Sequence, residues 1–165
     1  MNTTDIEIDV RNVQQLPAER ALAADAARAT VELMAGELGD VGAPSEEGHQ
    51  QVQVSILLTN DAHIAELNRE YRGLNEPTDV LAFPQSHDGD EGPVEGALGD
   101  VVVSVERAYE QAAEAGGSSE AEICELVVHG VLHLVGFEDD TADGRQRMQE
   151  RQREVLANLG LGEAG

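Results

Sequence analysis

Two short apolar runs rich in β-branched residues constrain the fold of this chain more than any other feature. The runs are VQVSILLT at 52–59 and LGDVVVSV at 98–105. Each has the length of a strand, and the run at 98–105 is typical of a strand buried inside a sheet. A segment with helical spacing follows each run. Strands that alternate with helices in one small chain indicate helices packed around a single sheet.

Two weaker strand signals and several helical segments complete this outline. DIEIDVR at 5–11 alternates acidic and apolar residues, and TDVLAFP at 78–84 is a short run that ends at a proline. The Gly-rich and acidic stretches 39–50 and 85–97 are predicted to be loops. We therefore expect one domain over residues 1–165, of the α/β (α+β) class, with a small, mixed, mainly parallel sheet of about four strands and about five helices. The predicted helices are 17–38, 60–70, 106–115, 119–135 and 142–159.

The charge balance is strongly acidic. The 165 residues include 10 basic and 33 acidic side chains, which gives a formal net charge of −23, and every basic residue is an arginine. The acids are spread along the chain, which indicates a solvated acidic surface rather than an interaction tail. We hypothesise a cytoplasm of high salt concentration, because at about 1 M salt the screening length falls to roughly 3 Å and self-repulsion largely vanishes.

The single cysteine and the termini bear on the compartment. One cysteine, Cys124, excludes an intramolecular disulfide framework and fits a reducing compartment; we expect a small buried helix residue rather than a nucleophile. The N-terminal residues show no secretory signal, and the longest apolar segment, 126–137, is too short and too interrupted to span a bilayer. We expect a cytoplasmic protein that does not bind membranes.

Two histidines in the segment HGVLHLVGFEDD, residues 129–140, form the most informative pattern. On a helix, His129 and His133 lie on one face, so both imidazoles can reach a single zinc ion. Gly136 can end the helix and turn the chain. Asp139, ten residues after the first histidine, can then supply a third ligand and leave a fourth position for water.

Other interpretations of this segment stay open. Both histidines could be structural residues of an amphipathic helix. Glu138 or Asp140 could replace Asp139 as ligand. A fourth protein ligand would make the metal structural, because structural zinc is normally closed by four side chains. The candidates for that fourth ligand are His63, His87, Glu138 and Asp140.

The residue after His129 argues against a zinc peptidase. Proteases of the H-E-x-x-H type place a glutamate directly after the first histidine, where it acts as general base. Here that residue is Gly130, which can accept no proton.

Three motifs in order resemble the YbeY family of bacterial endoribonucleases, the ribosomal RNA maturation factors. They are LNREYRGLNEPTDVLAFP at 67–84, LGDVVVS at 98–104 and the histidine segment, within about residues 50–150. The resemblance implies a zinc-dependent single-strand endoribonuclease that acts in ribosomal RNA processing and ribosome quality control. It also implies that His129, His133 and Asp139 hold the one zinc ion, although the third ligand is usually histidine in that family. Arg72 would meet the RNA backbone.

The chemistry of Arg72 agrees with that role. A guanidinium is always charged and can hold a phosphate with two parallel hydrogen bonds. The alternative is a structural ion pair with Glu70, Glu76 or Asp79. The proton acceptor stays open between Asp100, the metal-activated water and the RNA 2′-hydroxyl.

An acidic chain does not offer the basic surface on which RNA binding ordinarily depends. Recognition of an RNA precursor would then depend on the ion, on Arg72 with Arg69 or Arg107, or on a partner such as the small ribosomal subunit or a ribosomal protein. Two rival functions stay open: another zinc metallohydrolase that resembles a peptidase, and a non-catalytic ribosome-assembly factor with a structural metal.

Overall fold

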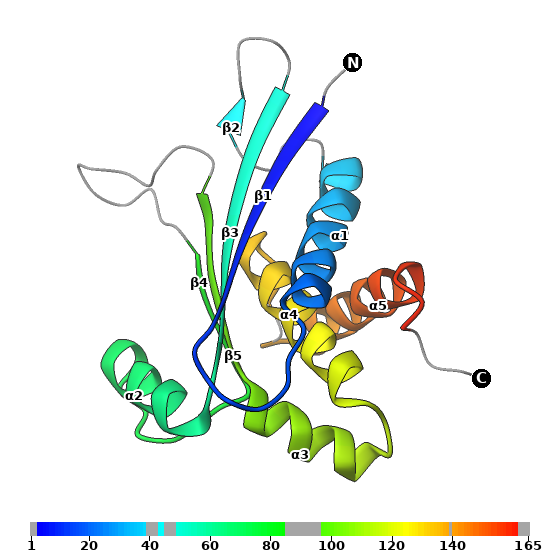
Figure 1. Ribbon diagram of the computed structural model, residues 1–165. Helices are drawn as coiled ribbons and strands as arrows, with labels where there is room; N and C mark the ends of the chain where they lie inside the picture. Colours follow the sequence, from blue (N-terminus) through cyan, green and yellow to red (C-terminus); the bar gives the residue numbers. More distant parts are fainter. Residues whose placement is uncertain (1–2, 39–42, 45–48, 85–96, 139, 162–165) are drawn as a thin grey trace.

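The computed structural model describes residues 3–38, 43–44, 49–84, 97–138 and 140–161. Its centre is one mixed sheet in the order β1-β3-β5-β4 (Figure 1). The three long strands β1, β3 and β5 are parallel, and β4 runs antiparallel to β5 at one edge. The predicted class, a mixed and mainly parallel sheet, is confirmed. The strands are β1 (Thr3–Asn12), β2 (Ala43–Pro44), β3 (His49–Thr59), β4 (Val80–Pro84) and β5 (Ala97–Ser104).

The prediction of a loop over residues 39–50 is wrong for part of this stretch. Ala43 and Pro44 form β2, which pairs antiparallel with β3, and β3 itself begins at His49. The local Gly, Pro and acidic composition carries no signal for this pairing, because the pairing depends on the presence of a neighbouring strand. His87 and the rest of the predicted loop up to residue 96 lie outside the described residues.

The described part of the chain contains five helices, as predicted, and they cover the two faces of the sheet unequally. In Figure 1, α1, α4 and α5 lie on one side of the sheet and α2 on the other, while α3 lies beyond the end of β5. Within the described residues, no helix is long and apolar enough to cross a membrane. The helices are α1 (Arg20–Leu38), α2 (Asp61–Arg72), α3 (Val105–Ala115), α4 (Ser119–Leu134) and α5 (Ala142–Asn158).

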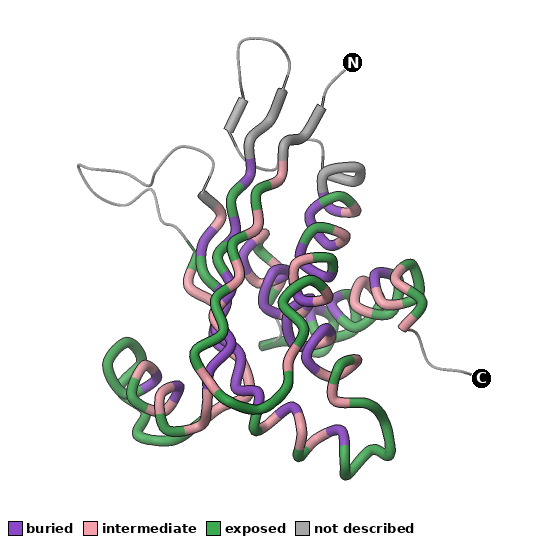
Figure 2. Tube along the Cα trace, in the orientation of Figure 1, coloured by how far each residue is buried: buried purple, intermediate pink, exposed green. Residues whose placement is uncertain are grey.

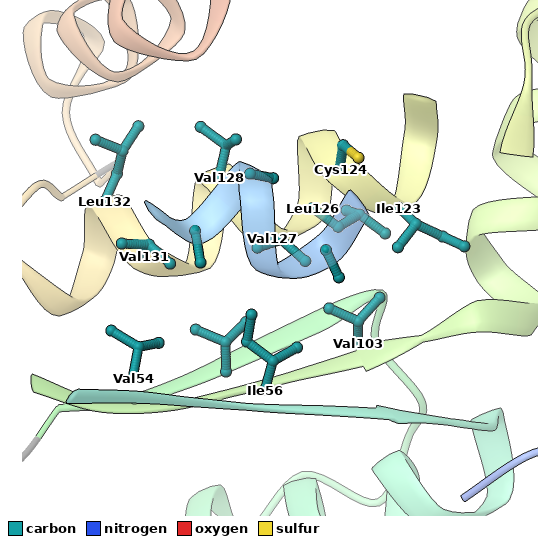
Figure 3. Close-up of a cluster of buried hydrophobic side chains, with 14 of the residues drawn as sticks. Val54, Ile56, Val103, Ile123, Cys124, Leu126, Val127, Val128, Val131 and Leu132 are labelled. Carbon is teal, nitrogen blue, oxygen red and sulfur yellow. The ribbon is translucent and has the colours of Figure 1, made fainter. Parts of the chain in front are cut away.

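The main core lies between the sheet and α4. Alternate β3 residues face this core and β5 contributes Val103, opposite a row of α4 side chains (Figure 3). Figure 2 shows buried residues around most of α4, as expected for a helix enclosed by the sheet, α1, α3 and α5. Because this core fixes α4 rigidly, the histidines on α4 have a fixed position relative to the sheet.

A smaller core lies on the opposite face, under α2. Ile64 of α2 packs there on Leu81 and Val102. The N-terminus of α2 is held by the Asn60 side chain, which accepts a hydrogen bond from the His63 amide, and Gly73 ends the helix in the left-handed conformation. This packing brings the C-terminal end of α2, with Tyr71 and Arg72, to the β4 edge of the sheet.

Candidate active site

His129 and His133 lie on the same face of α4, as their spacing predicts. Their Nε2 atoms are 3.1 Å apart, and the two ring planes are inclined by 76°. Both side chains are partly buried. Two nitrogen ligands at about 2.0–2.1 Å from a tetrahedral zinc ion are roughly 3.3 Å apart. The two imidazoles therefore fit a shared zinc ion with little rearrangement.

The second nitrogen of each ring fixes its orientation and its proton. Nδ1 of His129 is 2.6 Å from Oε1 of Gln152 on α5, and Nδ1 of His133 is 2.9 Å from the carbonyl oxygen of Phe137. These oxygens only accept hydrogen bonds, so each Nδ1 is the donor and carries the proton. An imidazole that carries its single proton on Nδ1 presents Nε2 as an electron-pair donor, which is the form that binds a metal.

The turn after α4 explains why the Phe137 carbonyl reaches His133. The amide of Phe137 donates to the Leu132 carbonyl, and the amide of Gly136 donates to the His133 carbonyl. Gly136 has a φ of 107°, a conformation that L side chains rarely adopt. This pair of hydrogen bonds is a Schellman motif, so the predicted glycine stop is confirmed.

The third predicted ligand, Asp139, lies outside the described residues, and its role stays a prediction. Among the described residues, no group of three or more His, Cys, Asp and Glu side chains could hold a metal ion. Of the two substitutes considered, Glu138 lines the cleft that contains the histidines, whereas Asp140 lines an adjacent hollow. His63 hydrogen-bonds through Nδ1 to Oγ1 of Thr59 at 2.7 Å and does not line that cleft.

The histidines face a cleft of about 830 Å³ at the β4 edge of the sheet, which we call the histidine cleft. Arg72 lines this cleft too, so the predicted site residues that can be described share one cavity. Within the described part of the chain, Arg72 takes no part in an ion pair, which argues against the structural alternative with Glu70, Glu76 or Asp79. The other lining residues are Tyr71, Thr78, Asp79, Val80, Leu81, Ala82, Phe83, Pro84, Gly130, Leu134, Gly136, Phe137 and Glu138.

Carboxylates near one wall give this region negative charge. Asp79 accepts a hydrogen bond from Nε2 of Gln111 at 3.2 Å, which holds its side chain in place. Burial raises the pKa of Glu122 above its ordinary value, and the nearby carboxylates Glu125 and Asp79 add to this rise. Among the described residues that line the cleft, Arg72 is the one arginine that can attract an anionic substrate.

Three residues considered from the sequence lie away from the histidine cleft. Asp100 lines a second groove, of about 550 Å³, on the face of the sheet that carries α2. We call this the open-face groove. Its position argues against Asp100 as the proton acceptor. Arg107 lies with Nε 3.5 Å from an oxygen of Asp61. Arg69 is exposed on α2 but does not line the cleft.

Sequence reasoning missed Gln152 and the Phe137 carbonyl. Gln152 follows His129 by 23 residues and lies on a different helix, so no periodic pattern connects them. The carbonyl contact depends on the turn geometry and could be expected only from the Gly136 signal. Tyr71 stood in one of the family motifs, but its position in the cleft carried no sequence signal of its own.

An α+β domain with two metal-competent imidazoles and a guanidinium around one open cleft is typical of a hydrolase for anionic substrates. Residues 20–160 match the family described as Endoribonuclease YbeY. Endoribonuclease YbeY of Moorella thermoacetica is 44% identical over 117 residues, covering 67% of this chain and 75% of the relative. That of Symbiobacterium thermophilum is 47% identical over 114 residues, covering 67% and 73%.

A solution structure from Thermotoga maritima has a similar fold. It matches with a TM-score of 0.57 and 27% sequence identity, covering 94% of this chain and 91% of that one. The chain belongs to the endoribonuclease YbeY family, and it is therefore a hydrolytic enzyme of the endoribonuclease class.

Proposed function

We propose that this endoribonuclease hydrolyses phosphodiester bonds of single-stranded RNA with one zinc ion held by His129, His133 and Asp139. Its substrates are ribosomal RNA precursors, and its place is the cytoplasm, in ribosomal RNA maturation and ribosome quality control. The observation that carries the proposal is the 3.1 Å separation of the two Nε2 atoms in a cleft that also contains Arg72.

The protein side chains supply positions and protonation states. Gln152 and the Phe137 carbonyl hold the protons on Nδ1 and direct each Nε2 toward the shared position. A zinc ion bound there would activate water and polarise a phosphoryl oxygen. Arg72 binds the oxygens of the scissile phosphate and stabilises the charge that develops on them.

The apolar side chains of the cleft strengthen these interactions. Leu81 and Leu134 are buried and Phe83 is partly buried, and all three line the cleft. A wall of this kind excludes water on one side of the bound phosphate, so the attraction between the guanidinium and the phosphate is greater than in bulk solvent.

Metal analysis combined with two substrates tests the proposal. The purified protein should contain close to one zinc per chain and should cleave a single-stranded ribosomal RNA precursor, but not casein. A chelator should abolish the cleavage and added zinc should restore it. The His133→Ala variant should lose both the zinc and the activity. Cleavage that persists in chelator, or in His133→Ala protein free of metal, would contradict the metal-dependent mechanism.

A cellular test addresses the ribosomal role. Depletion of the protein should cause ribosomal RNA with unprocessed ends to accumulate, and the wild-type chain should correct this whereas the His133→Ala chain should not. Normal ribosomal RNA ends after depletion would contradict the role in maturation while leaving the nuclease activity itself in place.

The peptidase alternative meets a steric obstacle. A β-carbon at Gly130 would lie 2.5 Å from Cγ1 of Val101, because α4 packs closely on β5 at this point. The position directly after His129 therefore has no room for the glutamate that H-E-x-x-H peptidases use as general base.

A further inference from the structure

Two hollows of this protein meet at a pair of aromatic rings. Tyr71 and Phe83 line both the histidine cleft and the open-face groove. Tyr71 is the penultimate residue of α2, and Phe83 belongs to β4, the strand at the edge of the sheet. A substrate bound along the β4 edge can therefore reach the open-face groove by passing these rings.

The Tyr71 ring is held in place but remains exposed. Its centroid lies 5.1 Å from that of Phe83, with the planes inclined by 56°, and Phe83 packs against the small core under α2. Despite this contact, Tyr71 is 63% exposed. The chain has two tyrosines, two phenylalanines and no tryptophan. The other tyrosine, Tyr109, is partly buried and donates its hydroxyl proton to the Pro17 carbonyl.

The charges on either side of the rings favour different parts of a nucleotide. Arg72, next to Tyr71, lines only the histidine cleft and can attract a phosphate. The open-face groove contains the exposed carboxylates Asp9 and Asp100, with Arg11 as its one basic lining residue. A phosphate in that groove would be repelled, whereas a nucleobase carries no net charge and its N–H groups can donate to carboxylates.

We propose that Tyr71, supported by Phe83, is a stacking platform for one nucleobase of the single-stranded RNA, next to the nucleotide whose phosphate is cleaved. The inference rests on the proposed function, because it requires RNA as the substrate. Proteins that bind single-stranded RNA commonly stack splayed bases on exposed aromatic rings, and this contact tolerates different base sequences. The ribose and phosphate stay in the histidine cleft at Arg72, and the base turns toward the open-face groove.

Tyrosine fluorescence offers a direct test. In a Tyr109→Phe protein, Tyr71 is the only tyrosine and there is no tryptophan, so the emission reports on Tyr71 alone. A short single-stranded RNA should quench this emission, whereas a ribose-phosphate oligomer of equal length without bases should bind through the backbone with little quenching. RNA that binds by anisotropy of a labelled strand without quenching would overturn the platform. Absence of any RNA binding would overturn the proposed function itself.

A substitution series separates stacking from a structural role. Tyr71→Leu should raise KM by about 5- to 150-fold, with a smaller effect on kcat, and Tyr71→Phe, which keeps an aromatic ring, should recover most of that loss. For the wild-type protein, an RNA that lacks the base facing Tyr71 should raise KM as much as the Tyr71→Leu substitution does on intact RNA. On the abasic RNA, Tyr71→Leu should have the same KM as the wild type. If Tyr71→Leu instead raises KM by the same factor on intact and on abasic RNA, Tyr71 only supports the fold.

Discussion

The Nε2 atoms of His129 and His133 lie 3.1 Å apart, and the Nδ1 atom of each ring donates a hydrogen bond to an oxygen that holds the ring in place. The two contacts come from different parts of the fold, Gln152 on α5 and the Phe137 carbonyl in the turn after α4. The fold itself therefore sets the orientation of both rings, which would lower the free-energy cost of binding a cation between them.

Replacing Gln152 by leucine should weaken zinc binding without removing a zinc ligand. This change removes the hydrogen bond that orients His129 and holds the proton on its Nδ1, and outer-shell changes of this kind typically cost about 10- to 100-fold in metal affinity. Competition with a fluorescent chelator measures the change. Gln149→Leu is the matched control, because Gln149 is exposed on the same helix. Equal zinc affinity of the two variants would contradict the role of Gln152.

Arg72→Ala should slow RNA cleavage far more than it reduces zinc content. Removing one group that stabilises transition-state charge typically costs about a hundredfold or more in kcat. The rate is measured with an end-labelled RNA and the zinc by atomic absorption. Arg69→Ala is the matched control, since both arginines are exposed on α2 but only Arg72 lines the histidine cleft. Unchanged cleavage by Arg72→Ala would remove this residue from the mechanism.

Much of the histidine segment could be predicted because its signals are local. The spacing of His129 and His133 determines their common face, and Gly136 supplies the conformation that ends α4. The contact with Gln152 could not be predicted, because it depends on how α5 crosses α4. Asp139 lies outside the described residues, so its part in the site stays a prediction.

In the sheet, too, the strands could be predicted from local sequence, whereas their pairing partners could not. The apolar character of the strands follows from the sequence, which predicts β3 as a strand and β5 as a buried strand. The antiparallel direction of β4 at the edge and the pairing of Ala43–Pro44 with β3 depend on partners distant in sequence. Periodicity within a segment carries no information about which neighbour that segment will pair with.

Gly130→Ala should destabilise the fold at the helix-sheet contact. Its β-carbon would lie 2.5 Å from Cγ1 and 3.0 Å from Cγ2 of Val101, and overpacking of a core typically costs about 1–3 kcal/mol. Thermal unfolding should show a lower Tm, partly restored by Val101→Ala in the same chain. Gly117→Ala, where a β-carbon meets nothing within 4 Å, should leave the Tm nearly unchanged. An unaltered Tm in Gly130→Ala would show that α4 can move away from β5.

Cys124 should be unreactive toward thiol reagents in the folded protein. Burial, together with the smaller effect of the carboxylates of Asp25, Glu120 and Glu19, raises the pKa of its thiol to about 11, and the residue has no exposed surface. At pH 8 only about one thiol in a thousand is then ionised, and the thiolate is the reactive form. Ellman's reagent should react with about one thiol per chain in denaturant and with almost none without it. Rapid labelling of the native protein would contradict this burial.

The acidic surface should make stability depend on salt. With 33 acidic and 10 basic side chains, the folded chain concentrates repulsion that the unfolded chain relieves by expanding. The screening length falls from about 30 Å at 0.01 M to about 3 Å at 1 M salt, so the Tm should rise steadily with KCl. Sucrose at matched osmolality is the control, because it is excluded from the protein surface but does not screen charge. It should therefore raise the Tm less than KCl does. A Tm that stays flat from dilute buffer to molar KCl would contradict adaptation to a cytoplasm of high salt concentration.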